Sequence, residues 1–221
     1  MSEVAERLAQ VRARVAAACA RVKRPVESVT LVAVSKLKPA ALIREAYEAG
    51  QRDFGENYAQ ELRDKAAELA GLEGLRWHAI GPLQMNKVKY VAKAAHSFHA
   101  LERLDVAQEL SKRRASAPLP CYAEVNLGGE QSKSGLAPEA LGPFLEAVRA
   151  LPGLRLEGLM ALPPPAEDME QARGYFQRLR ELARAHGLTG LSMGTTHDFE
   201  LAIEEGATLV RVGTALFGER A

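Results

Sequence analysis

Apolar positions along the chain alternate between a helical and a strand-like spacing. Near the start, Val4, Leu8, Val11 and Val15 recur every three or four residues, which predicts a helix over residues 2–22. Beyond it, short apolar runs bounded by glycine, proline or polar residues alternate with amphipathic stretches. The short runs predict eight strands, over residues 31–35, 53–54, 75–80, 97–99, 120–126, 154–160, 191–193 and 208–212.

The amphipathic stretches between these runs have the length of helices. In the first of them, Pro39 suits an opening helical turn and Gly50 a helix end. The predicted helices cover residues 39–49, 55–70, 85–91, 103–114, 138–151, 167–186 and 197–205, with a last turn at 214–217.

Strands that alternate with helices predict an α/β fold with a parallel sheet and helical crossovers. Eight such units in roughly 200 residues favour a closed (β/α)8 barrel of the TIM type, near its lower size limit. We therefore expect residues 1–221 to form a single barrel domain, with residues 1–28 as an extra N-terminal helix and lead-in. An open doubly wound sheet is the alternative, because short strands are hard to count.

Composition narrows the range of partners. The 29 basic residues nearly balance the 28 acidic ones, so no overall field attracts nucleic acid or a membrane surface. No apolar stretch approaches the roughly 20 residues of a membrane span, and the charged start does not resemble a signal peptide. Cys19 and Cys121 lack metal-ligand spacing, which favours a reducing compartment. We expect a cytoplasmic monomer without a metal site.

Lys36 is the first candidate for chemistry. Side chains alternate along a strand, so Val32, Val34 and Lys36 should point the same way and carry an amine to the mouth of the barrel. Partial desolvation favours the neutral amine, which attacks carbonyls to form a Schiff base. The alternative is a solvated lysine at a strand end.

Further polar or soft side chains follow the predicted strands, and barrels of this kind place their active site at the carboxyl ends of the strands. As a single histidine, His78 has an alternative role as a structural hydrogen-bonding group. The side chains expected at this rim are Lys36, Asn57, His78, Asn126, Met160, Ser192 and Arg211.

The segments after the last two strands have the composition of a phosphate site. Residues 192–198 contain Gly194 and Thr196, and residues 211–218 contain Gly213 and Thr214, each near a predicted helix start. Free N–H groups at helix starts bind phosphate, and glycine lets the backbone approach it. Helix capping by the two threonines is the alternative. The flexible segment 128–135 could cover the barrel mouth or provide a second anion contact.

Five motifs occur in order from about residue 29 to the end: Val34-Ser35-Lys36; Phe54-Gly55-Glu56-Asn57-Tyr58; Trp77-His78-Ala79-Ile80-Gly81 with Leu83-Gln84-Met85-Asn86-Lys87; Ser192-Met193-Gly194 with Asp198; and Val210-Arg211-Val212-Gly213 with Phe217-Gly218. Together they resemble the pyridoxal phosphate homeostasis proteins, which are single-domain barrels similar to the amino-terminal domain of alanine racemase. The family usually has Met-Ser where this chain has Thr195-Thr196, so the phosphate hydroxyl would come from Thr196.

The resemblance implies that Lys36 holds pyridoxal 5′-phosphate (PLP) as an internal aldimine. It implies a carrier that affects PLP and amino-acid pools without an established enzyme activity, and it makes PLP-requiring apoenzymes candidate partners. The cofactor-binding residues that we expect are Lys36, Asn57, His78, Met160, Ser192, Gly194, Thr196, Arg211, Gly213 and Thr214.

Two enzyme classes remain as alternatives. A small PLP-dependent racemase needs a base on each face of the substrate, and the racemase resemblance implies a second domain that is missing after the eighth strand. Tyr58 or His78 would then have to substitute. Arg211 would face the pyridine nitrogen and keep it unprotonated, which weakens the ring as an electron sink. A Schiff-base aldolase acting on a sugar phosphate would share the lysine and the phosphate site.

Overall fold

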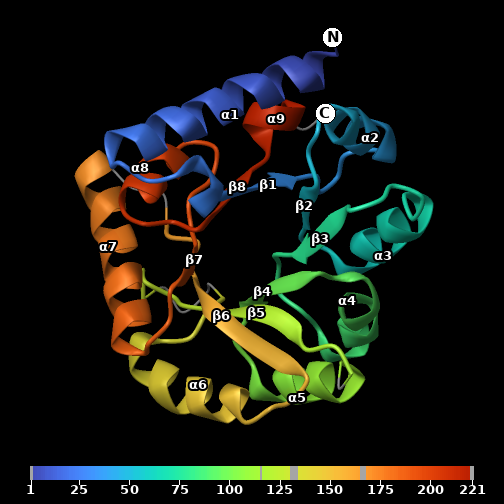
Figure 1. Cartoon of the computed structure of the whole chain (residues 1–221). Coiled ribbons are helices and arrows are strands. Elements are labelled where there is room, and N and C mark those ends of the chain that lie inside the picture. The colour runs from blue at the N-terminus through green and yellow to red at the C-terminus, as the bar shows by residue number, and fades with distance from the viewer. Residues whose placement is uncertain (1, 115, 130–133, 165–167, 220–221) are drawn as a thin grey trace.

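Eight parallel strands close into a barrel in which each strand pairs with the next and β8 pairs with β1 (Figure 1). The computed structural model describes residues 2–114, 116–129, 134–164 and 168–219. The closed ring confirms the predicted TIM-type barrel and rules out the open sheet. The strands are β1 Thr30–Val34, β2 Asp53–Glu56, β3 Arg76–Ala79, β4 Ser97–Leu101, β5 Leu119–Glu124, β6 Leu154–Met160, β7 Gly190–Ser192 and β8 Leu209–Val212.

Helices follow each strand and surround the barrel (Figure 1). Short 3-10 turns at Val26–Ser28, Met85–Lys87 and Pro138–Ala140 precede β1, α4 and α6. The α-helices are α1 Glu3–Arg21, α2 Ala40–Glu48, α3 Ala59–Glu68, α4 Val88–Ala94, α5 Leu104–Arg113, α6 Leu141–Arg149, α7 Met169–Ala185, α8 Phe199–Glu204 and α9 Thr214–Phe217.

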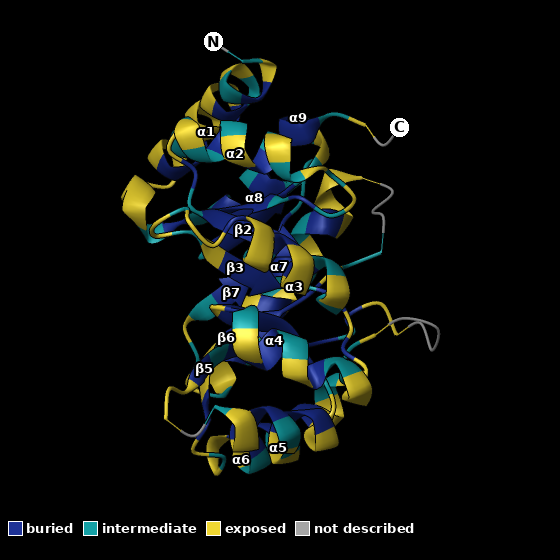
Figure 2. Ribbon diagram, turned by 90° about the vertical axis from the view of Figure 1, so that its right-hand side faces the viewer, coloured by how far each residue is buried: buried dark blue, intermediate teal, exposed yellow. Residues whose placement is uncertain are grey.

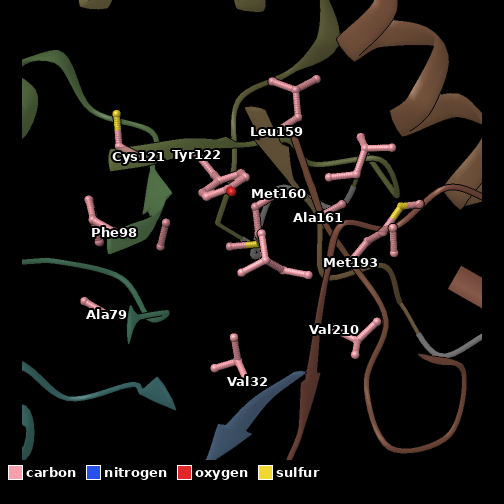
Figure 3. Close-up of a cluster of buried hydrophobic side chains, with 14 of the residues drawn as sticks. Val32, Ala79, Phe98, Cys121, Tyr122, Leu159, Met160, Ala161, Met193 and Val210 are labelled. Carbon is pink, nitrogen blue, oxygen red and sulfur yellow. The ribbon is translucent and has the colours of Figure 1, made fainter. Parts of the chain in front are cut away.

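The hydrophobic core has two layers, because side chains of adjacent strand residues point to opposite faces. Val32, Tyr122 and Met160 point into the space that the strands enclose, whereas Leu159 and Cys121 point away from it (Figure 3). The strands are accordingly mostly buried, and the outer faces of the helices carry many exposed residues (Figure 2). The outer layer of the core packs the helices against the strands and keeps the strand ends in fixed positions.

The N-terminal helix α1 packs against α8, α9 and α2 (Figure 1). Ser2 caps its start by accepting a hydrogen bond from the Ala5 N–H, and its apolar stripe is buried. Two ion pairs tie α1 to α8: Arg14 with Glu200 at 2.9 Å and Arg21 with Glu204 at 2.7 Å. The helix therefore covers the elements that follow the last two strands.

Strand β2 continues through Gly55 and Glu56, two residues that the sequence analysis assigned to the start of the following helix. Gly55 lies where a Cβ would approach Val32 and Ile80 to about 3 Å, and Glu56 is buried among polar partners.

Within the described ranges, no helix is long and apolar enough to cross a membrane. Those same ranges contain no group of three or more His, Cys, Asp or Glu side chains placed to hold a metal ion.

Candidate functional site

A cavity of about 570 Å³ opens at the carboxyl ends of the strands. This volume lies within the usual range for sites that bind small molecules. Seven of the ten residues expected from the sequence line it: Lys36, Asn57, Met160, Thr196, Arg211, Gly213 and Thr214. Its other lining residues are Val34, Ile80, Gly81, Pro82, Glu124, Ser134, Leu162, Pro163, Thr195 and His197.

Lys36 enters this cavity from the turn that follows β1. Val34 lines the cavity beside it, as the strand alternation predicts, and Ser35 between them is fully buried on the other side. The next residue, Leu37, has φ +60°, a left-handed conformation that is uncommon for a residue with a side chain. Other contacts must hold this turn in place.

Those contacts come from a buried group that we name the β1 clamp: Lys65, Glu56 and Glu61. The Lys65 ammonium donates to the Ser35 carbonyl at 2.7 Å, to Glu56 Oε1 at 2.8 Å and to Glu61 Oε1 at 2.7 Å. The Ser35 hydroxyl also donates to Glu56 Oε1, at 2.6 Å. On the far side of Lys36, the Leu37 N–H donates to Glu61 Oε1 at 2.6 Å. The backbone is thus held on both sides of Lys36.

Burial sets the electrostatics of the clamp. It raises the pKa of Glu56 to about 7, against the opposing effect of the hydrogen bonds from Lys65 and Ser35. Neither Glu56 Oε2 nor Glu61 Oε2 has a hydrogen-bond partner among the residues described. Both carboxyl groups therefore share the ammonium of Lys65 through their Oε1 atoms, and each receives one further hydrogen bond there, from the Ser35 hydroxyl or the Leu37 N–H.

The loop after β7 forms the side of the cavity that carries Thr195 and Thr196. Asp198 Oδ1 accepts hydrogen bonds from the Thr195 N–H at 2.6 Å and from its hydroxyl at 3.0 Å. Gly194, at φ +91°, does not line the cavity, because it lies against α8, where a Cβ would be 2.5 Å from Ala202 Cβ. Its role here is to let the loop approach the helix.

The capping alternative for the threonines does not account for their positions. Helix α8 is capped at Asp198 and α9 at Gly213, and neither cap makes a side-chain hydrogen bond among the described residues. Thr196 and Thr214 instead line the cavity. A hydroxyl group at each position is a suitable donor to an anion.

Arg211 provides the cationic part of the cavity. Its Nη1 donates to Ser192 Oγ at 2.6 Å and its Nη2 to the Ala161 carbonyl at 2.9 Å. Burial lowers its pKa to about 10, while the charges of Glu124 and Asp198 act in the opposite direction, so it stays protonated near neutral pH. Burial raises the pKa of the neighbouring Glu124 to about 7, and the charge of Glu102 adds to that effect.

His78 and Ser192 lie inside the barrel and do not line the cavity. His78 Nε2 lies 2.9 Å from Asp53 Oδ1, and its Nδ1 lies 3.0 Å from His99 Nε2. His99 Nδ1 lies 2.8 Å from Ser192 Oγ. The structural role weighed for His78 thus matches its contacts, and the hydrogen bond to Arg211 connects Ser192 to the cavity from within the barrel.

Sequence reasoning missed Glu124 as a lining residue, whereas Gly81 lies in one of the five motifs named from the sequence. Glu124 ends β5 and was hidden in a run treated as ordinary strand, although an acid at a strand end was a usable signal. Gly81 lies where a Cβ would be 2.5 Å from the Asn57 carbonyl oxygen, so two loops cross there without space for a side chain. Asn126 does not line the cavity; its Oδ1 accepts from the Gly129 N–H at 3.0 Å. Residues 130–133 of the segment expected to cover the mouth lie outside the described residues.

A larger hollow of about 1070 Å³ lies between α3 and α4, lined mainly by alanines, leucines and basic side chains. Its lining contains amines and guanidinium groups but no carboxylate and no serine or threonine hydroxyl, so it lacks the mixture of groups found at the strand ends. We therefore place the candidate site at the barrel mouth.

Comparisons with known proteins agree with this placement. The family model for the alanine racemase N-terminal domain matches residues 7–221. A pyridoxal phosphate homeostasis protein of Pseudomonas aeruginosa is 51% identical over 224 residues, which cover 100% of this chain and 97% of that protein. The protein of the same name from Escherichia coli K12 is 44% identical over 232 residues, with 100% and 98% covered.

Solved structures give the same result at the level of the fold. PipY from Synechococcus elongatus, with PLP bound, superposes with a TM-score of 0.87 at 36% identity, covering 98% of this chain and 100% of PipY. Alanine racemase from E. faecalis superposes with a TM-score of 0.69 at 16% identity, covering 95% of this chain and 58% of the racemase, which is a likeness of fold alone. The chain belongs to the pyridoxal phosphate homeostasis protein family.

Proposed function

We propose that this protein binds PLP in the cavity at the barrel mouth and acts in PLP homeostasis, holding the cofactor through a covalent bond to Lys36. PLP supplies an aldehyde that condenses with an amine and a ring that accepts electrons. The observation that carries the proposal is the convergence of Lys36, Arg211, Thr196 and Thr214 on one cavity of about 570 Å³.

The residues present fit this cofactor. Lys36 provides the amine, and the β1 clamp holds the backbone on either side of it. Thr196 and Thr214 provide hydroxyl donors for a phosphate, with Gly213 leaving the backbone accessible between strand and helix. Arg211 provides a buried donor for the pyridine nitrogen, and the side chain of Met160 and the amide of Asn57 complete the proposed lining. His78, Ser192 and Gly194 support the site from outside the cavity.

The same geometry favours a carrier over a racemase. Arg211 stays protonated and can only donate, so a ring nitrogen facing it stays unprotonated. Of the two substitute bases considered from the sequence, His78 has both ring nitrogens within hydrogen-bond distance of Asp53 and His99, and Tyr58 is exposed and does not line the cavity. We expect PLP-requiring apoenzymes to receive the cofactor.

Absorbance and covalent trapping test the proposal. The purified protein should be yellow, and borohydride should fix the cofactor to the peptide that contains Lys36. Lys38 is the matched control, because its Nζ donates to the Glu219 carbonyl at 2.7 Å and it does not line the cavity. We expect Lys36→Arg to abolish trapping and Lys38→Arg to leave it unchanged; labelling of Lys38 or Lys87 would refute the assignment. An aldolase would be colourless when pure.

A further inference from the structure

A continuous line of buried polar side chains runs through the barrel to Arg211. Such groups are costly to bury unless each is hydrogen-bonded, and every link here is within hydrogen-bond distance. The members are Asp53 on β2, His78 on β3, His99 on β4, Ser192 on β7 and Arg211 on β8, all at most 7% exposed.

The two ends of this line fix the direction of its hydrogen bonds. At one end Arg211 has only donors, so Ser192 Oγ must accept from Nη1. At the other end Asp53 is held as a carboxylate: although burial opposes it, hydrogen bonds from Arg76 and His78 lower its pKa to about 2. An ionised carboxylate can only accept, so His78 Nε2 must carry a proton.

When the rings of His78 and His99 are both neutral, only one arrangement of their protons satisfies every hydrogen bond in the middle of the line. His78 is protonated on Nε2, so its Nδ1 accepts from the His99 Nε2–H. His99 Nδ1 is left as an acceptor for the Ser192 hydroxyl proton. Complete burial keeps His99 neutral, since desolvation lowers its pKa well below the ordinary value; the charge of Arg211 acts in the same direction, as would any positive charge on His78.

The far end of the line reaches the opposite mouth of the barrel. Asp53 forms a two-armed ion pair with Arg76, at 2.7 Å and 2.5 Å, and both residues line a separate cavity of about 410 Å³ at the amino ends of the strands. The line therefore joins a solvent-facing ion pair at one end of the barrel to the proposed cofactor cavity at the other.

We propose that these five groups form a directional relay in which every donor points from Arg211 towards Asp53, and that the relay holds Arg211 in place in the wall of the cavity. Hydrogen bonds in a chain polarise one another, so a change at Asp53 alters the acceptor strength of Ser192. His78 and His99 are then positioning residues for Arg211. The relay's effect on the cofactor rests on the proposed function, whereas the proton arrangement does not.

Nitrogen-15 NMR of histidine-labelled protein, prepared without PLP, tests the arrangement directly. We expect His78 and His99 each to be neutral and protonated on Nε2 alone, with assignments taken from His78→Gln and His99→Gln. A proton on Nδ1 of His99, or a doubly protonated ring at neutral pH, would overturn the directional relay. This result does not depend on whether PLP binds.

The effect on the site is tested in PLP-loaded protein. We expect His99→Leu to remain reducible onto Lys36 but to release PLP about tenfold faster, with a shifted absorbance band, because Ser192 loses its acceptor and Arg211 its fixed partner. Asp53→Asn should also speed PLP release and shift the absorbance band in the same direction, but by a smaller amount than His99→Leu. His96→Gln is the matched control, since His96 is exposed and its ring lies 6.0 Å from that of His78 without a hydrogen bond to the relay.

Unchanged release and absorbance in both relay variants, when fully loaded, would overturn the positioning role. If the wild-type protein binds no PLP, the proposed function fails, and the NMR measurement still decides the proton arrangement. If His99→Leu does not fold, Asp53→Asn and the NMR measurement carry the test.

Discussion

The β1 clamp makes Lys65→Met the most informative stability variant. The methionine keeps the length of the side chain but removes the ammonium that donates to Ser35, Glu56 and Glu61. Removing one partner of a buried ion pair typically costs about 3–5 kcal/mol, because the remaining charge is left uncompensated. We expect a loss of that size in the free energy of unfolding, measured with urea at pH 8.

The pH dependence distinguishes a lost ion pair from lost packing. In the wild-type protein, burial raises the pKa of Glu56 from 4.5 to about 7, so the folded state binds the proton more tightly than the unfolded state. The contribution of Glu56 to stability should therefore fall by about 3 kcal/mol as pH rises from 4.5 to 7 and level off above it. Glu124, whose pKa is also raised to about 7, adds a fall of the same sign in both proteins, so the difference between wild type and variant isolates the clamp. In Lys65→Met the pKa of Glu56 rises further, so the fall continues above pH 7 and the loss relative to wild type grows with pH.

The control for this variant is Lys89→Met on α4, where the lysine is exposed. We expect it to change stability by no more than about 0.5 kcal/mol. The same preparations should be assayed for PLP trapping, which should weaken in Lys65→Met alone because the turn around Lys36 loses its support. A loss below about 1 kcal/mol, or one that does not vary with pH, would refute the role given to Lys65.

Three further outcomes are expected. Thr196→Ala and Thr214→Ala should each weaken PLP retention by about 1–3 kcal/mol, because the phosphate loses a hydroxyl donor. Binding of pyridoxal, which lacks the phosphate, should be nearly unchanged when measured by titration. Equal weakening of both ligands would mean that the threonines are structural. Arg211→Glu, if loaded with PLP, should exchange the α-proton of alanine in heavy water faster than wild type, as measured by NMR. It should still racemise alanine poorly, as measured by chiral analysis. Rapid racemisation by the wild-type protein would contradict the carrier function. Gly81→Ala should lower stability by about 1–3 kcal/mol in urea denaturation, because its Cβ would meet the Asn57 backbone at 2.5 Å, and a neutral result would contradict that contact.

Local periodicity was enough to predict the barrel and the position of Lys36. Strand alternation has a period of two, so the placement of Val34 and Lys36 on one wall needs only the sequence around them. The strand β6, Leu154–Met160, begins with alternating apolar and charged residues and has the predicted bounds. The rim position of Arg211 follows in the same way from the end of β8.

The relay and the clamp could not be predicted, because their contacts join strands and helices far apart in the sequence. His78 is only 3.0 Å from His99, although 21 residues separate them, and His99 meets Ser192 across 93 residues. Whether His78 reaches the rim or turns into the barrel depends on the register of β3 against its neighbours, which a single sequence does not contain. The end of β2 was missed for the same reason, since Glu56 is tolerated in a buried strand only through Lys65 and Ser35.

The pairing of β1 with β8 also has a consequence for biosynthesis. This seam joins Thr30–Val34 to Leu209–Val212, the first and last strands to leave the ribosome. Lys36 stands on one side of the seam, and Arg211 and Thr214 stand on the other. Because the contacts across it span nearly the whole chain, the seam closes late in folding. The amine and the opposite wall of the cavity therefore meet only after β8 has been made, so a nascent chain cannot sequester cofactor before its barrel is closed.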